Sequence, residues 1–94
     1  MVTEYRNYID GEFLANRSGA LIDVHNPATH ELLARVPDAP NDVVDLAVQA
    51  ARAAQPGWAK LPAIQRAQYL RVIAAKLREN VEELAHTITA EQGK

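Results

Sequence analysis

The sequence contains no cysteine among its 94 residues. This absence excludes disulfide bonds, thiolate metal sites and a thiol nucleophile within these residues. Aromatic residues make up only 5% of the chain, and much of its 48% apolar content is alanine. Each predicted helix therefore has little apolar surface to bury. We expect one small domain at most, of marginal stability if it stands alone.

An excess of positive charge is also lacking, since ten lysine and arginine residues face twelve aspartate and glutamate residues. The formal net charge of −2 and the lack of a basic stripe argue against a nucleic-acid partner. Residues 1–10 hold three charged side chains and no apolar run, so we expect neither a signal peptide nor a membrane span to begin there. These features predict a cytoplasmic location. The glycosylation sequon Asn16-Arg17-Ser18 carries no weight in that compartment.

The first extended runs flank Asp10-Gly11. This dipeptide is typical of a two-residue hairpin turn in which both turn positions need positive φ. We therefore predict strands near residues 5–9 and 12–15.

A second pair of extended runs follows. Residues 20–25 form a third run that ends at Asn26-Pro27, because proline lacks the N–H that a sheet ladder needs. Residues 29–31 complete this turn, and a fourth apolar run over residues 32–37 follows it. Two hairpins in a meander are the predicted arrangement of residues 1–39.

From residue 40 onward the apolar residues follow a helical period. Asn41 is predicted to cap the first helix, with Asp42 and Asp45 near its positive end. The predicted helix ends by Gln55-Pro56-Gly57. Its predicted apolar face consists of Val44, Ala47, Val48 and Ala51.

A second helix is predicted from near Pro62, a residue that favours the first helical turn. Asn80 and Glu83 have the spacing of a capping box, yet the apolar stripe continues in phase, so one long helix and two helices both fit. Gly93 is the predicted C-cap. The stripe contains Ala67, Leu70, Ile73, Ala74, Leu77, Val81, Leu84 and Ile88. The whole pattern predicts an α+β fold, with β-hairpins in residues 1–39 and two or three amphipathic α-helices in residues 40–94.

Few side chains suggest chemistry. His25 and His30 lie on either side of the Asn26-Pro27 turn without a third ligand of suitable spacing, so we interpret them as polar residues that flank the turn and predict no metal site. His86 stands alone on the helical stretch. The acidic patch is interpreted as a solvated helix face rather than a pair of catalytic carboxylates. It consists of Glu79, Glu82 and Glu83.

Nucleophile and cofactor patterns are equally sparse. Ser18, the one serine, lies outside any G-x-S-x-G elbow. Trp58 is interpreted as filling the space between two helices rather than stacking on a ligand. The four glycines are too far apart to form a phosphate-binding loop, which predicts no cofactor site in the segment. They are Gly11, Gly19, Gly57 and Gly93.

Several short motifs, taken in order, resemble the opening of the NAD(P)-dependent aldehyde dehydrogenase superfamily. The similarity covers nearly all 94 residues. Residues 54–56 and 61–64 look most similar to lactaldehyde and glycolaldehyde dehydrogenases. The motifs are Tyr8–Phe13 (YIDGEF), Val24–Thr29 (VHNPAT), the helix with Asp42-Val43, Ala47-Val48 and Ala50-Ala51, Gln55–Trp58, Arg66-Ala67 and Glu91–Lys94 (EQGK).

The resemblance implies an oxidoreductase that oxidises an aldehyde to a carboxylic acid with NAD or NADP on a Rossmann-like domain. In such enzymes a cysteine attacks the aldehyde and a glutamate activates the water that releases the acid. The resemblance carries no catalytic, cofactor-binding or metal-binding residue onto this sequence. It implies instead a hairpin layer and helices that pack beside the cofactor domain, with no cofactor bound by the segment itself.

Two hypotheses follow. In the first, these residues are an N-terminal segment of an aldehyde dehydrogenase, inactive alone, whose partner is the remainder of that chain or a full-length relative. In the second, the chain is a non-catalytic interaction module that docks, or self-associates, through its alanine-rich helix faces.

Overall fold

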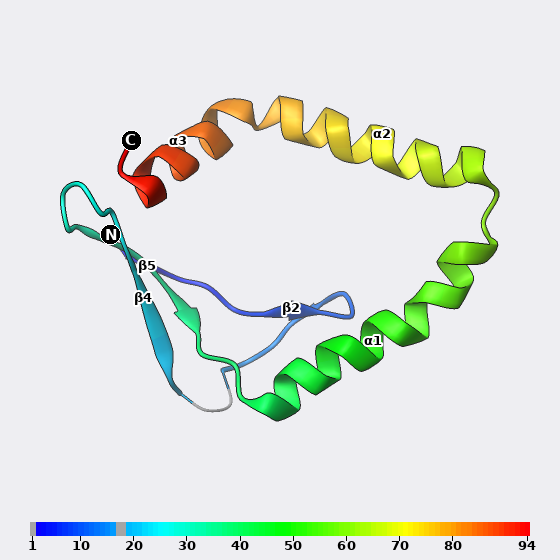
Figure 1. Cartoon of the computed structure of the whole chain (residues 1–94), viewed down its shortest axis with the longest axis horizontal. Coiled ribbons are helices and arrows are strands. Elements are labelled where there is room, and N and C mark those ends of the chain that lie inside the picture. The colour runs from blue at the N-terminus through cyan, green and yellow to red at the C-terminus, as the bar shows by residue number, and fades with distance from the viewer. Residues whose placement is uncertain (1, 17–18) are drawn as a thin grey trace.

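A computed structural model of the chain describes residues 2–16 and 19–94. Short strands occupy the N-terminal part and helices the rest, which confirms the predicted α+β fold with three helices (Figure 1). The strands are β1 (Thr3–Glu4), β2 (Tyr8–Ile9), β3 (Glu12–Phe13), β4 (Leu21–His25) and β5 (Leu32–Pro37). The helices are α1 (Asn41–Lys60), α2 (Ala63–Glu79) and α3 (Val81–Gln92).

The two predicted hairpins are present, but the predicted meander is wrong. Strand β5 lies at the centre of a three-stranded sheet in the order β1-β5-β4, with β4 antiparallel to it and β1 parallel. The strand predicted near residues 5–9 is limited to residues 8–9, which pair with β3, and residues 3–4 form a further strand that was not predicted and pairs with β5. Two parallel strands need a long connection between them, and residues 5–31 provide it between β1 and β5. Strand β1 therefore pairs with the edge of β5 that β4 leaves free.

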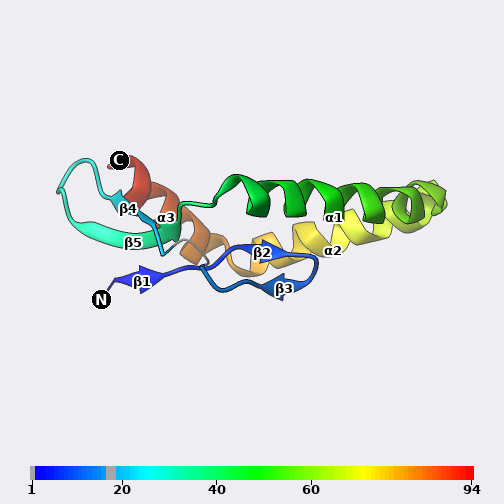
Figure 2. The ribbon, with the colours of Figure 1, turned by 90° about the horizontal axis from the view of Figure 1, so that it is seen from below.

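The β2–β3 hairpin forms a separate two-stranded sheet. Asp10 and Gly11 both have positive φ, at 51° and 77°, as predicted for this turn. The rings of Tyr8 and Phe13, directly opposite in register, meet edge to face with centroids 4.8 Å apart. A hairpin this short is marginal by itself, and it lies along α1 (Figure 2).

Helix α1 differs from prediction at both ends. Pro40 is its N-cap, and the side chain of Asn41, the predicted cap, makes no capping bond. At the other end the helix continues through Pro56 to Lys60. An interior proline removes one helix hydrogen bond and its ring crowds the carbonyl four residues earlier, at a cost of about 3 kcal/mol, so α1 continues through Pro56 against the local preference.

The stripe after Pro62 belongs to two helices, not one. The N-cap of α2 is Pro62, and Asn80 separates α2 from α3. The predicted capping box is absent, because the Nδ2 group of Asn80 donates to the carbonyl of Lys76 at 2.8 Å and so closes the end of α2. The predicted C-cap is confirmed, since Gly93 adopts the left-handed conformation with φ of 73°.

The elements are arranged as an open ring rather than a packed globule. Helix α1 runs along one side, α2 spans the opposite side, and α3 returns to the sheet (Figure 1). The radius of gyration is 16.9 Å, whereas a compact domain of this length has about 12 Å. The accessible surface is 7715 Å², roughly 2,300 Å² more than a compact monomer of this mass exposes.

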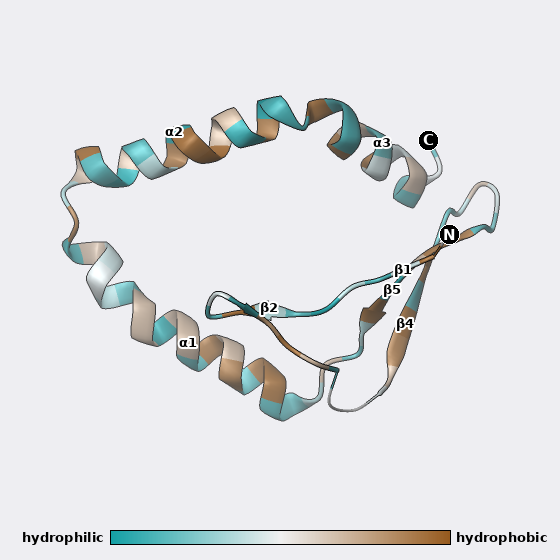
Figure 3. Ribbon diagram, turned by 180° about the vertical axis from the view of Figure 1, so that it is seen from behind, coloured by the Kyte–Doolittle hydropathy of each residue, from teal (hydrophilic) through white to brown (hydrophobic). Residues whose placement is uncertain are grey.

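The apolar core is correspondingly small. Of the described residues, only Val43 at the start of α1 is a buried hydrophobic, at 6% exposure. The buried face of α1 lies one residue earlier in the sequence than predicted. Val43 is buried, whereas Val44 and Val48, both on the predicted apolar face, are about half exposed. Hydrophobic residues, coloured brown in Figure 3, recur along both long helices. The α1 residues that line hollows with the hairpin are Leu46, Ala47, Gln49, Ala50, Ala51 and Ala54.

Candidate functional site

The hollow between α3 and the three-stranded sheet has the most varied lining. It has a volume of roughly 370 Å³. His86 and Glu91 are its ionisable imidazole and carboxyl groups, and the phenol of Tyr5 lies on the sheet side. The remaining lining residues are Val24, Leu33, Ala34, Val36, Thr87 and Ala90. A mainly apolar lining with four scattered polar side chains is typical of an uncovered packing surface rather than of a site with a positioned nucleophile.

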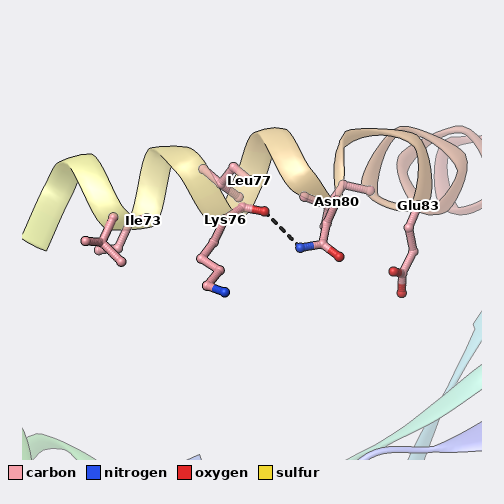
Figure 4. Close-up of a pocket in the computed structure, with 7 residues that line it drawn as sticks. Ile73, Lys76, Leu77, Asn80 and Glu83 are labelled. Carbon is pink, nitrogen blue, oxygen red and sulfur yellow. Dashed lines mark hydrogen bonds between the residues drawn. The ribbon is translucent and has the colours of Figure 1, made fainter.

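A second hollow lies where α2 bends into α3, with a volume of roughly 400 Å³. Lys76, Asn80 and Glu83 supply its polar atoms, and they project from one side of the two helices (Figure 4). Asn80 already donates to the helix backbone, and Lys76 lies 3.6 Å from Glu79 in an exposed ion pair. The apolar lining consists of Val72, Ile73, Leu77 and Leu84.

The histidines and acidic residues do not assemble into a site. His25 is the last residue of β4 and His30, with φ of 64°, lies at the other end of the following turn, so both flank the turn as interpreted. His86 lies on α3, away from that turn in the sequence. Glu79, Glu82 and Glu83 are all exposed. Within residues 2–16 and 19–94, no three His, Cys, Asp or Glu side chains lie close enough together to hold a metal ion.

None of the four glycines forms the turn of a dinucleotide-binding motif. Gly11 is at a hairpin tip, Gly19 precedes β4, Gly57 is inside α1 and Gly93 ends α3, so none of them opens a helix after a strand. Ser18 and its neighbour Arg17 lie outside the described residues. Among the helices that are described, none is long and apolar enough to cross a membrane.

Trp58 lies at the junction of the two long helices. Its ring meets that of Tyr69 edge to face, with centroids 5.5 Å apart, so the tryptophan joins α1 to α2 as interpreted. It nevertheless remains 41% exposed. Next to this junction, the Nε group of Arg66 is shielded from water and has no hydrogen-bond acceptor among the described residues. Composition and spacing gave no signal for this donor.

A close contact that periodicity did not indicate joins α3 to the β4–β5 turn. A Cβ atom at Gly93 would lie 2.8 Å from Cγ of Pro27 and 2.9 Å from the backbone nitrogen of Ala28. Side chains essentially never approach that closely, so this position requires glycine both for its φ and for its contact.

The comparison with known proteins gives the segment its family. The model of the aldehyde dehydrogenase family matches residues 13–94, which include all three helices. The chain belongs to the aldehyde dehydrogenase family.

Curated aldehyde dehydrogenases extend well beyond this segment. The chain is 47% identical over 87 residues to the lactaldehyde dehydrogenase of Escherichia coli (strain K12), which covers 93% of the chain and 18% of that enzyme. It is 39% identical over 90 residues to the 3,6-anhydro-alpha-L-galactose dehydrogenase of Vibrio sp. (strain EJY3), covering 96% of the chain and 19% of that enzyme. The chain thus spans about a fifth of the length of the curated relatives it matches.

Solved aldehyde dehydrogenase structures contain the same arrangement. A lactaldehyde dehydrogenase superposes with a TM-score of 0.92 at 43% identity, covering 97% of this chain and 19% of that one. A 3,6-anhydro-L-galactose dehydrogenase in complex with NAP superposes with a TM-score of 0.90 at 37% identity, over 97% of this chain and 19% of that one. The predicted family, and its particular similarity to lactaldehyde dehydrogenases, are confirmed. The open ring is therefore a part of the family fold.

Proposed function

We propose that this sequence is the structural N-terminal part of an oxidoreductase that oxidises a small aldehyde to a carboxylic acid with NAD or NADP, and that it is inactive alone. The observation that carries the proposal is the family match over residues 13–94, in a segment whose ring stays open. The catalytic thiol must come from elsewhere, since these residues contain no cysteine.

The exposed surface supports a partner that covers the ring. An excess of roughly 2,300 Å² over a compact monomer is the area per partner that a large permanent interface buries. The partner in this proposal is the remainder of an aldehyde dehydrogenase polypeptide. An acceptor from it would also satisfy Arg66 Nε, and an unsatisfied buried donor of this kind costs about 1–3 kcal/mol.

The substrate and the nicotinamide form belong to the same proposal. Related enzymes carry the names of lactaldehyde and methylmalonate-semialdehyde dehydrogenases, and related structures hold NAD or NAP. We expect a short aldehyde to be the substrate. In this proposal the described residues have a structural role in that enzyme, since they contain neither a glycine-rich turn nor a cluster of metal ligands. A cytoplasmic location stays a prediction.

Fragment complementation tests the proposal. The chain is purified alone and also co-expressed with Escherichia coli lactaldehyde dehydrogenase from which the matching segment has been deleted. We expect no NADH formation by the chain alone with NAD and lactaldehyde, and lactaldehyde-dependent NADH formation by the co-expressed pair.

The controls test separately whether the chain is inactive alone and whether it completes an aldehyde dehydrogenase. NADH formation by the chain alone would disprove its inactivity. A soluble complex of the two pieces without activity would argue for a docking module instead. Replacing Gln68 with aspartate on the polar side of α2 should leave the complementation intact, whereas aspartate at both Ile73 and Leu77 should abolish it, because these two side chains lie on the stripe that the partner must cover.

A further inference from the structure

The turn between β4 and β5 is held by its own hydrogen bonds. The side-chain oxygen of Asn26 accepts from the backbone nitrogens of Ala28 and Thr29, at 2.9 and 3.3 Å. The backbone of Asn26 donates to the carbonyl of Glu31 and accepts from the nitrogen of His30. These local hydrogen bonds stabilise the conformation of the turn.

The end of α3 sits against this turn. Gly93 donates to the carbonyl of Thr89 and so ends the helix in the left-handed conformation. This places its α-carbon where a side chain would collide with Pro27 and with the backbone of Ala28. Elsewhere α3 and the sheet enclose an open hollow of roughly 370 Å³, so the contact at Gly93 is the tight part of this interface.

We propose that residues 26–29 and Gly93 form a clasp that fixes the C-terminal end of α3 against the β4–β5 turn, while the middle of the ring stays unfilled. The turn and α3 are connected along the chain only through β5, α1 and α2 (Figure 1). The clasp joins the two ends of that path without a covalent bond. It holds α3 against the sheet and keeps the inner side of the ring open, as a preformed frame. This inference does not depend on the proposed enzyme activity.

Three glycines provide a matched set of variants. Gly93→Ala adds a methyl group at a position with both positive φ and a collision. Gly11→Ala adds one at a similar φ of 77° with nothing within 4 Å, and Gly57→Ala adds one inside α1 with nothing within 4 Å. Gly93→Ala therefore tests the clasp. Gly11→Ala tests backbone strain without a collision, and Gly57→Ala controls for an added methyl group without strain or collision.

The experiment measures the distance across the clasp in the 94-residue chain. Because the sequence has no cysteine, Glu31→Cys and Gln92→Cys provide two exposed sites for nitroxide labels. The distance distribution is recorded by double electron–electron resonance in the presence of trimethylamine N-oxide, which offsets marginal stability. Circular dichroism of each variant monitors helix content.

We expect a narrow short-distance population in the parent chain and in both control variants, and its loss in Gly93→Ala with the helix content retained. Three results would overturn the clasp. They are an unchanged distribution in Gly93→Ala, an equal loss in Gly11→Ala, and a parent chain without a short-distance population.

Discussion

Helices α1 and α2 have similar lengths and run on opposite sides of the ring, but they differ in what covers them. Helix α1 lies on the β2–β3 hairpin and holds the buried Val43. Helix α2 meets α1 through the Trp58–Tyr69 ring pair and α3 at its far end, and it contains no buried residue. Because a helix is held in place mainly by burial of its apolar face, α1 is supported from within the segment and α2 needs support from outside it.

The largest expected effect comes from substitutions on the exposed apolar stripe of α2. Ile73 and Leu77 are both 54% exposed and line the same hollow at the bend into α3. If the uncovered stripe drives association of the chain alone, Ile73→Asp combined with Leu77→Asp should weaken that association by about a hundredfold or more, because each buried side chain contributes about 1.5–3 kcal/mol. Sedimentation velocity over a range of concentrations measures it.

The control for this prediction carries the same type of charge on the same helix. Gln68→Asp adds a negative charge at an exposed polar position of α2, and association should be nearly unchanged. A parent chain that stays a folded monomer at high concentration would show that the stripe does not drive association. Equal loss in both variants would assign the effect to charge alone.

A smaller effect, on the free energy of unfolding, is expected for a substitution at the buried position of α1. Val43→Ala should lower the free energy of unfolding by about 1.5 kcal/mol, because it removes two methyl groups from a buried position. Val44→Ala is the matched control, since its side chain is 51% exposed and surface substitutions usually change stability by less than about 0.5 kcal/mol. Urea denaturation followed by circular dichroism gives both values. A larger loss of stability in Val44→Ala than in Val43→Ala would show that α1 buries the face predicted from the helical period.

These two valines show what the sequence could and could not predict. The helical period of residues 41–54 was clear, but alanine and valine occur around much of the helix, and the burial of Val43 rather than Val44 depends on tertiary contacts that the local sequence does not show. The turn at Asp10-Gly11 and the C-cap at Gly93 were predictable because both need a left-handed backbone that few residues adopt.

Tertiary placement was the part that local patterns missed. The parallel pairing of Thr3 with Ala34 joins strands far apart in the sequence, so periodicity gives no signal for it. Pro56 was predicted to end α1 because an interior proline disfavours a helix, and the continuation of the helix to Lys60 had no signal in the local sequence. The residue types predict no catalytic or cofactor-binding residue in this segment, since the chain has no cysteine and its glycines are scattered, and this stays a prediction.

The smallest expected effect compares two asparagines, one predicted to act as a helix cap and one found to hold a turn. Asn26→Ala removes the oxygen that accepts from Ala28 and Thr29, and it should cost about 1 kcal/mol of stability. Asn41→Ala removes no capping bond, and alanine is the better helix former by several tenths of a kcal/mol, so stability should stay equal or rise slightly. Thermal unfolding of both variants against the parent checks the pair. A loss in Asn41→Ala as large as that in Asn26→Ala would restore Asn41 as the cap of α1, and with it the boundary that the sequence alone predicted.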